Sequence, residues 1–172
     1  MPDDLAAGPS PSADGWVEPG PLEPRWLSDD EQRAWRQLVG VVLRLPGELD
    51  AQLRRDAGLG HFEYWVLALL SEAPDGTRRL SELASQANAS LSRLSHVVSR
   101  LERRGWVRRE PCPDDHRATL AVLTAAGSDQ VVATAPGHVG TVRELVFDQL
   151  TDDDVERLGR LCATILERIE AP

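Results

Sequence analysis

Residues 91–104 place hydroxyl, imidazole and guanidinium side chains along one face of a predicted helix. The opposite face is expected to anchor this helix to its domain through Leu91, Leu94, Val97, Val98 and Leu101. The polar face consists of Ser92, Arg93, Ser95, His96, Ser99, Arg100 and Arg103. Arginine can bond guanine twice, histidine can bond a base edge or a phosphate, and short serines allow a backbone to come close. This face therefore predicts contact with a DNA major groove, with an ordinary solvated surface as the alternative.

A charged hairpin follows that helix. Residues 106–110 and 118–123 are predicted to be strands, separated by two prolines and an acidic pair. Arg108 and Arg109 alternate along the first strand, so one is expected to face a DNA backbone and the other the domain. The tip carries Asp115, His116 and Arg117. A tip of this kind can be presented to the minor groove beside the recognition helix.

Capping residues predict where the polar helix and the shorter helix before it begin and end. Ser90 is expected to cap the polar helix and Gly105 to end it, while Ser81 caps a shorter helix ending near Ala87. The helix N-terminus behind Ser90 could also receive a phosphate. Two helices joined by a tight turn and followed by a hairpin form a helix-turn-helix with a wing.

The chain before this region begins with a proline-rich segment. Residues 1–27 lack apolar periodicity and are predicted to be disordered. Ser28 with Glu31 then predicts a capping box, and apolar residues continue at helical spacing over 35–53. Because Pro46 lies inside this stripe, a kink or break of the helix is expected there.

The remaining segments predict a mainly α fold with a small β-hairpin wing, as one domain over 28–172. An almost wholly apolar helix over 61–72 should be central. Two helices follow the hairpin, one over 124–150 interrupted at Pro136-Gly137 and one over 151–169. The first and last helices are apolar on more than one side, which predicts that they form a dimer interface.

Composition narrows the class of protein. The net charge of −9 argues against nucleic acid, but residues 77–117 hold nine arginines and five acids, giving +4 there and −13 elsewhere. A basic patch on an acidic body still attracts phosphate locally. The sequence has no long apolar run and no secretory signal, which predicts a cytoplasmic protein without a membrane partner. Its histidines and cysteines show no HxxxH or CxxC spacing, so neither a metal nor a cofactor is predicted.

With these elements placed, the chain from about Ser28 to Ile169 strongly resembles the MarR family of bacterial transcription regulators. The matching motifs are LSELA, SRL followed by SRLERRGWVRR, and the wing sequence DDHRATLAVLT leading into TAAG. The resemblance implies a winged helix-turn-helix over 61–123 and dimerisation helices over 28–57 and 124–170. It further implies an obligate homodimer that binds a pseudo-palindrome in double-stranded DNA and usually represses transcription.

The resemblance also assigns roles in the wing. It implies that Asp115 orients an arginine and that Arg117 or its neighbour enters the minor groove, where narrow A-tracts favour arginine. His116 stands where many relatives carry arginine, so a weaker, pH-sensitive contact is expected, with solvent exposure as the alternative. The residues expected at DNA are Ser90, Ser92, Arg93, Ser95, His96, Ser99, Arg100, Arg103, Arg108, Asp115, His116 and Arg117.

Many members of that family are released from DNA by a small phenolic or other aromatic effector. The resemblance places its pocket between the dimer helices and the winged domain, where the candidates are Trp35, His61, Phe62, Tyr64 and Trp65. Arg36 or Arg54 could meet a carboxylate or phenolate. The alternative is that Tyr64 and Trp65 are core residues, which the apolar helix favours for Trp65, and that His61 is a cap or surface residue.

Other classes of function are less well supported. Cys112 is expected to be exposed near Arg109 and Arg117, which would suit a redox-responsive regulator, whereas Cys162 is expected in the core. The family's peroxide sensors, however, carry their reactive cysteine near the N-terminal helices, where this chain has none. A winged-helix module for protein contact is disfavoured by the basic window. An enzyme is excluded because the sequence has no nucleophile elbow, phosphate-cradling loop or convergent carboxylate pair.

Overall fold

The computed structural model describes residues 24–171, apart from the side chain of His116. The tail predicted over residues 1–27 therefore lies almost wholly outside the described residues. The described chain divides between Gln37 and Leu38 into two units, and every element after α1 belongs to the second.

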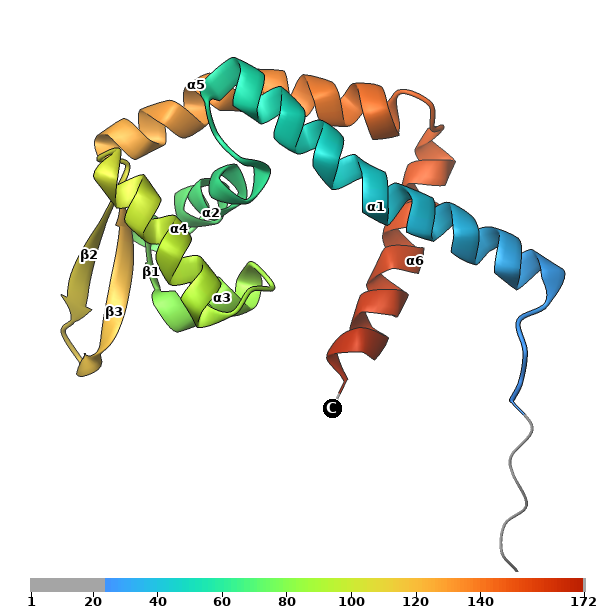
Figure 1. The fold of residues 1–172 in the computed structure, drawn as a ribbon, viewed down its shortest axis with the longest axis horizontal. Coiled ribbons are helices and arrows are strands. Elements are labelled where there is room, and N and C mark those ends of the chain that lie inside the picture. The colour runs from blue at the N-terminus through green and yellow to red at the C-terminus, as the bar shows by residue number, and fades with distance from the viewer. Residues whose placement is uncertain (1–23, 172) are drawn as a thin grey trace, which may run out of the picture. The chain divides into compact units, whose positions relative to one another are not determined.

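The described residues form a mainly helical fold with one small sheet (Figure 1). In chain order the elements are α1 (Asp29–Ala57), α2 (His61–Ser71), a 3-10 turn (Pro74–Gly76), β1 (Thr77–Arg79), α3 (Leu80–Gln86), α4 (Leu91–Arg103), β2 (Val107–Cys112), β3 (Asp115–Leu123), α5 (Ala125–Val142), a π-helical turn (Arg143–Phe147) and α6 (Asp152–Glu170). The antiparallel sheet has the strand order β1-β3-β2. This arrangement confirms the predicted fold class.

Helix α1 begins as predicted but does not break. The Ser28 N–H donates to Glu31 Oε2 at 2.7 Å, and the Glu31 N–H donates to Ser28 Oγ at 3.3 Å, which completes the capping box. Of the kink or break expected at Pro46, the break does not occur, because the helix continues to Ala57. The Pro46 ring is exposed to solvent, and buried Leu49 and Leu53 hold the turns that follow it against the domain.

Helix α5 also runs through its proline. Thr124 caps it as predicted, its Oγ1 accepting from the Gly127 N–H at 3.0 Å. The interruption expected at Pro136-Gly137 was wrong, since Pro136 is exposed and lies inside a continuous helix. The irregular turn comes later, over Arg143–Phe147, where the backbone is π-helical. A capping box between Thr151 and Asp154 then opens α6.

Strand β1 was not predicted, and it changes where α3 begins. Thr77 lies opposite Val122 of β3, and Arg79 lies opposite Leu120. Because this pairing keeps the backbone extended as far as Arg79, α3 starts at Leu80 with Arg79 as its N-cap. Ser81 is therefore the second residue of the helix, and its predicted role as the cap was wrong.

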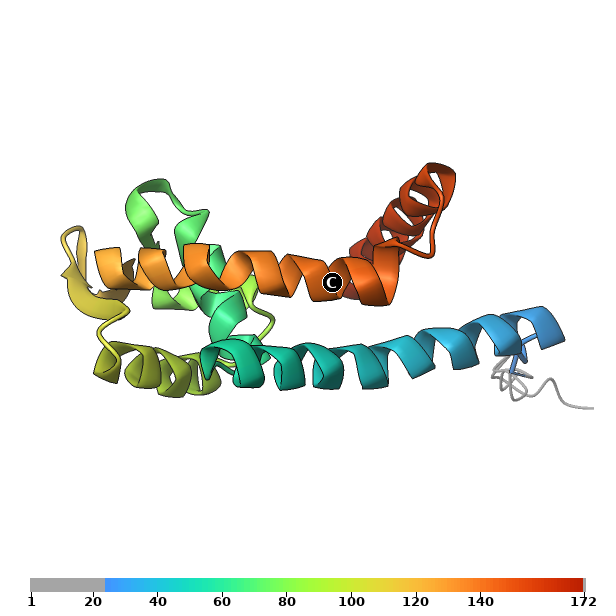
Figure 2. The same cartoon turned by 90° about the horizontal axis from the view of Figure 1, so that it is seen from above.

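The hairpin forms longer strands than expected. Pro111 and Asp115, predicted to lie between the strands, belong to β2 and β3. Strand β2 is at an edge of the sheet, where a proline without an N–H is tolerated. The register shifts between Pro111 and Cys112. The hairpin and α5 start from the same end of the domain (Figure 2).

Helix α2 is central to the core, as predicted. Val66, Leu67 and Leu70 are fully buried, and they belong to one cluster with buried residues of α3, α4, β2 and β3. Trp65, however, is 45% exposed, so its expected place in the core was wrong. The nearly continuous apolar run concealed that one face of α2 is turned outward.

The two cysteines exchange their expected environments. Cys112 is only 3% exposed, because it packs inward at the register shift of the hairpin. Cys162 is exposed, as is nearly every residue of α6 in the single protomer. Both expectations were wrong. Across residues 24–171, none of the helices has the length and apolarity that a membrane span requires.

Candidate nucleic-acid interface

Helix α4 presents its polar face to solvent. The Ser90 Oγ accepts from the Arg93 N–H at 3.2 Å, which confirms the predicted cap. Four apolar residues anchor the opposite face in the core, namely Leu94, Val97, Val98 and Leu101. Leu91, expected among them, is instead 53% exposed, because it lies at the first turn, beyond the edge of the core. Of the residues predicted on the polar face, Ser92, Arg93, His96, Arg100 and Arg103 are exposed.

Glu63 of α2 holds Arg100 from the side of the domain. Its Oε1 accepts from Arg100 Nε at 2.6 Å, and its Oε2 accepts from the Gly60 N–H at 3.0 Å. Burial alone would raise the pKa of this carboxyl, but the two hydrogen bonds and the positive charge of Arg100 outweigh burial and lower its pKa. The ionised carboxylate thus fixes one edge of a half-exposed guanidinium.

Sequence reasoning missed Glu63, although a signal for it exists. It is the only charged residue within the apolar helix α2, and it occupies the third position after the Gly60 N-cap. A lone acid in an apolar helix requires a partner, since an unpaired buried charge is costly. A second contact between α4 and α2 lies nearby: the guanidinium carbon of Arg93 is 4.2 Å from the centre of the Phe62 ring.

The two arginines of β2 point in different directions, as predicted. Arg109 faces the domain and bonds α4, whereas the exposed Arg108 is paired with Glu110 at 2.6 Å on its own strand. Ser95 and Ser99 are half-buried, and both accept from Arg109. These two serines are therefore less open to solvent than the rest of the predicted polar face.

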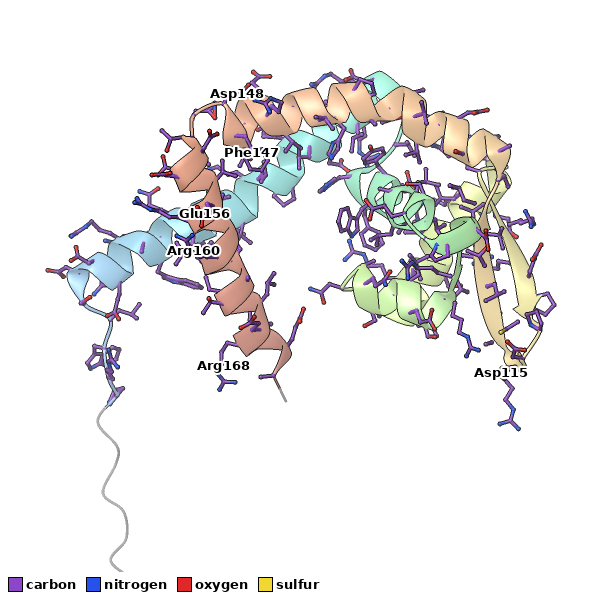
Figure 3. The ribbon with its side chains drawn as sticks, turned by 180° about the vertical axis from the view of Figure 1, so that it is seen from behind. Asp115, Phe147, Asp148, Glu156, Arg160 and Arg168 are labelled. Atoms are coloured by element: carbon purple, nitrogen blue, oxygen red, sulfur yellow. The ribbon has the colours of Figure 1, made fainter. Side chains whose placement is uncertain are left out.

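Asp115 lies at the end of the hairpin (Figure 3). Its Oδ1 accepts from the Arg117 N–H at 3.0 Å. Asp115 thus holds the main chain of Arg117 and leaves the exposed guanidinium free to project from the strand. Arg117 also borders a cavity of about 320 Å³ together with Leu91 and Ser95 of α4. The wing and the polar helix therefore line one concave surface.

Comparison with known proteins shows which family this chain is similar to. The model of the MarR family matches residues 61–119. The HTH-type transcriptional repressor IacR of Pseudomonas putida is 31% identical over 164 residues, covering 94% of this chain and 93% of that protein. The chain belongs to the MarR family. Members of this family are transcriptional regulators, so this MarR-family protein is a regulator and not an enzyme.

Solved structures of Streptomyces coelicolor regulators extend the likeness. Sco3205, a MarR family transcriptional regulator in complex with DNA, superposes with a TM-score of 0.84 at 45% identity, covering 87% of this chain and 94% of that chain. AbsC, another MarR family regulator, gives a TM-score of 0.80 at 38% identity, covering 85% and 98%.

The MarR-family chain also has a larger cavity of about 870 Å³ between α1, α2 and α4. Among its lining residues are Asp50, Arg54, Phe62, Glu63, Arg93 and Arg100. Of the five residues expected in a ligand pocket, only Phe62 lines this cavity. Trp35 and Trp65 are exposed, while His61 and Tyr64 contact α5 instead.

A histidine pair joins α2 to α5 in this MarR-family protein. The ring centre of His138 lies 5.9 Å from that of His61 and 4.7 Å from that of Tyr64. His61, expected at the surface or as a cap, is half-buried, and Asp50 Oδ1 accepts from the main-chain N–H of His61 at 2.9 Å. Burial lowers the pKa of His61, which the charge of Asp50 opposes. Burial, and then the proximity of His61, lowers the pKa of His138.

The histidine pair predicts a stability that depends on pH. Unfolded histidines titrate near 6.5, and both folded pKa values lie below that. As the pH falls below about 6.5, the unfolded chain takes up protons that the folded chain does not, so stability is lost until the folded pKa values are passed. The unfolding midpoint, followed by calorimetry from pH 7.5 to pH 5, should decline, and His138→Gln should decline less. Parallel curves for the two proteins would contradict this account.

Proposed function

We propose that this MarR-family regulator is a dimeric repressor that binds a pseudo-palindromic operator through α4 and the wing. The observation that carries the proposal is the concave surface where Leu91 and Ser95 of α4 meet Arg117 of the wing, on the helix that also exposes Arg93, His96 and Arg100. A helix with polar side chains and a neighbouring charged loop can occupy a major groove and the adjacent minor groove together. In support, Sco3205 has been solved in complex with DNA, and IacR is a transcriptional repressor.

The proposed contacts divide into those that identify bases and those that hold phosphates. Arg93, His96 and Arg100 are exposed along α4, and such side chains on a helix in the major groove can contact base edges. The remaining proposed contacts are Ser90, Ser92, Arg103, Arg108, Asp115, His116 and Arg117. Arg103 and Arg108 are the better phosphate partners, since Arg103 ends α4 and Arg108 lies on an edge strand.

The proposed dimer follows from apolar side chains that one protomer leaves exposed. They include Leu38, Val41 and Val42 on α1, Val139 on α5, and Leu158, Leu161, Ile165 and Ile169 on α6. Exposed apolar side chains on three helices favour burial against a partner, and a second copy of the chain supplies the same side chains. In this proposal the helices over 28–57 and 124–170 form the dimer interface, and the two winged domains each bind one half of a pseudo-palindrome.

An effector is part of the proposal. The larger cavity combines Phe62 with Arg54, Arg93 and Arg100, a set suited to a small aromatic ring that bears a negative charge. Because Arg93 and Arg100 are also proposed DNA contacts, a ligand that binds them competes with DNA for the same side chains. Ligand binding would in this way release the operator.

The proposal is tested by titrating the purified protein against its own upstream DNA and a scrambled control, using fluorescence anisotropy at two salt concentrations. Tight binding to the upstream fragment alone supports a sequence-specific regulator, and aromatic carboxylates and phenols are then added to that complex. Equal binding to both fragments would place the operator elsewhere. Failure to bind either fragment would favour a winged-helix module that contacts other proteins.

Arg117→Ala should weaken binding to specific and non-specific DNA alike. A dimer that neutralises about eight phosphates gives a slope of log K against log salt near −7. Loss of one contact in each protomer should reduce the magnitude of this slope by about two. The measurement is the same titration repeated over a series of salt concentrations. An unchanged affinity and slope would remove Arg117 from the interface.

A further inference from the structure

Arg109 of β2 forms four hydrogen bonds to α4. Its Nη1 donates to Glu102 Oε2 at 2.8 Å. Its Nη2 donates to the Ser95 carbonyl at 2.8 Å, to Ser95 Oγ at 3.3 Å and to Ser99 Oγ at 3.0 Å. The side chain is only 25% exposed, so the guanidinium lies between the strand and the helix.

The acceptors follow one line along the helix. Ser95, Ser99 and Glu102 are spaced by four and three residues, so they lie on the same side of α4 over two turns. The Ser99 hydroxyl also donates to the Ser95 carbonyl at 2.9 Å, which closes the network. A planar guanidinium can serve several acceptors at once, whereas a lysine ammonium acts as a compact point charge. The residue type therefore matches the geometry.

We propose that Arg109 is a positioning residue that fixes the recognition helix α4 against the wing, with Ser95 and Ser99 as its acceptors instead of base contacts. The inference rests on the proposed function, because it concerns how that surface reads DNA. The major-groove helix and the minor-groove loop stand on different elements, and Arg109 is the side chain that joins β2 to the polar side of α4. Groups that recognise a target must be held close to the productive geometry by neighbouring hydrogen bonds.

This role separates two properties of DNA binding. Specific binding requires α4 and the wing in the correct mutual position, whereas non-specific binding requires positive charge near the phosphates. Loss of Arg109 should therefore reduce preference for the operator without changing the number of phosphates contacted. Arg108, the adjacent residue on the same strand, should show the opposite behaviour, because it is exposed and paired only along β2.

The experiment uses the full-length dimer and an operator selected from a random pool of duplex DNA. Five variants are compared with wild type on the operator and on scrambled DNA. They are Arg109→Gln, Arg109→Lys, Arg108→Gln, the double variant Ser95→Ala with Ser99→Ala, and this double variant combined with Arg109→Gln. Circular dichroism melting first establishes a temperature at which each variant is fully folded. Anisotropy titrations over a salt series then give both affinities and both slopes.

Arg109→Gln should lower operator affinity about tenfold, the order of one lost base contact, and leave scrambled-DNA affinity and the salt slope unchanged. Arg109→Lys should not restore the preference. The double serine variant should lose part of it, and adding Arg109→Gln to that variant should cost less than Arg109→Gln does alone. Arg108→Gln should instead weaken both DNAs equally and reduce the slope by about two.

Four outcomes would overturn the inference. A folded Arg109→Gln dimer with the wild-type preference for operator would make the cluster purely structural. A reduced salt slope in that variant would make Arg109 a phosphate contact. Additive losses from the serine and arginine variants would separate the serines from Arg109. If wild type itself shows no preference for the selected DNA, the proposed function fails and the positioning role fails with it.

Discussion

Replacing Gly127 with alanine is expected to lower the free energy of unfolding by about 3 kcal/mol, the upper range for overpacking a tight site. A Cβ at this position would lie 2.1 Å from the Trp106 carbonyl oxygen and 2.9 Å from its carbon. It would also lie 2.8 Å from Leu123 Cδ1. Two of these three atoms belong to the backbone and cannot rotate away, so the start of α5 must move.

The junction around Gly127 explains why movement is costly. The Thr124 N–H donates to the Trp106 carbonyl at 3.0 Å, and the Thr124 hydroxyl donates to the Gly105 carbonyl at 2.7 Å. The same hydroxyl accepts from the Gly127 N–H. These bonds tie the end of the hairpin, the end of α4 and the start of α5 together. Displacing α5 disturbs all three.

Gly140→Ala is the matched control, because Gly140 lies in the same helix with no atom within 4 Å of an added Cβ. Alanine there should be neutral or stabilise by up to about 1 kcal/mol. In thermal unfolding, the midpoint of Gly127→Ala should lie about 10 °C below that of wild type, since about 1 kcal/mol of stability corresponds to 2–4 °C in a chain of this size. Equal midpoints for the two variants would show that the junction relaxes around the extra methyl group.

Leu161→Asp should convert the proposed dimer to a monomer and lower affinity for the proposed operator by about 100-fold or more. Leu161 is 63% exposed in the protomer and lies on the apolar stripe of α6. A carboxylate there would be buried without a partner in the dimer, at a cost that an apolar contact cannot offset. Separate protomers lose the gain from binding two half-sites together, which commonly reaches 10²–10⁴-fold. Sedimentation and anisotropy measure the two effects.

Arg160→Gln provides the control for α6. Arg160 pairs with Glu156 on the polar side of the helix (Figure 3), away from the apolar stripe that contains Leu161. This substitution should leave both the sedimentation coefficient and the DNA affinity at wild-type values. A Leu161→Asp protein that sediments as a dimer and binds the operator normally would place the dimer interface elsewhere.

Capping residues in the sequence correctly predicted the helix starts that depend only on neighbouring residues. The caps at Ser90, Thr124 and Thr151 are formed as expected, because a hydroxyl at the N-cap acts within three residues of itself. The same reasoning failed at Ser81. There the strand β1 pairs with β3, about forty residues away, and that distant pairing decides where the helix starts.

Long-range contacts account for most of what the sequence did not indicate. The prolines at 46 and 136 were expected to disrupt helices, but both rings face solvent and tertiary packing maintains the helix beyond them. The network of Arg109 joins residues up to fourteen positions apart, and the pair between Glu63 and Arg100 spans thirty-seven. Residue types identified the polar face, but only the fold shows which of its members already have partners.

The burial of Cys112 and the exposure of Cys162 supply two chemical reporters within one chain. A thiol enclosed in the hairpin reacts with a labelling reagent only when the hairpin opens, so its rate measures local unfolding of the wing. A thiol on α6 reacts freely in a lone protomer and is protected when a second copy covers the helix. One time course of alkylation, resolved by peptide mass, would therefore follow opening of the wing and association of the subunits separately.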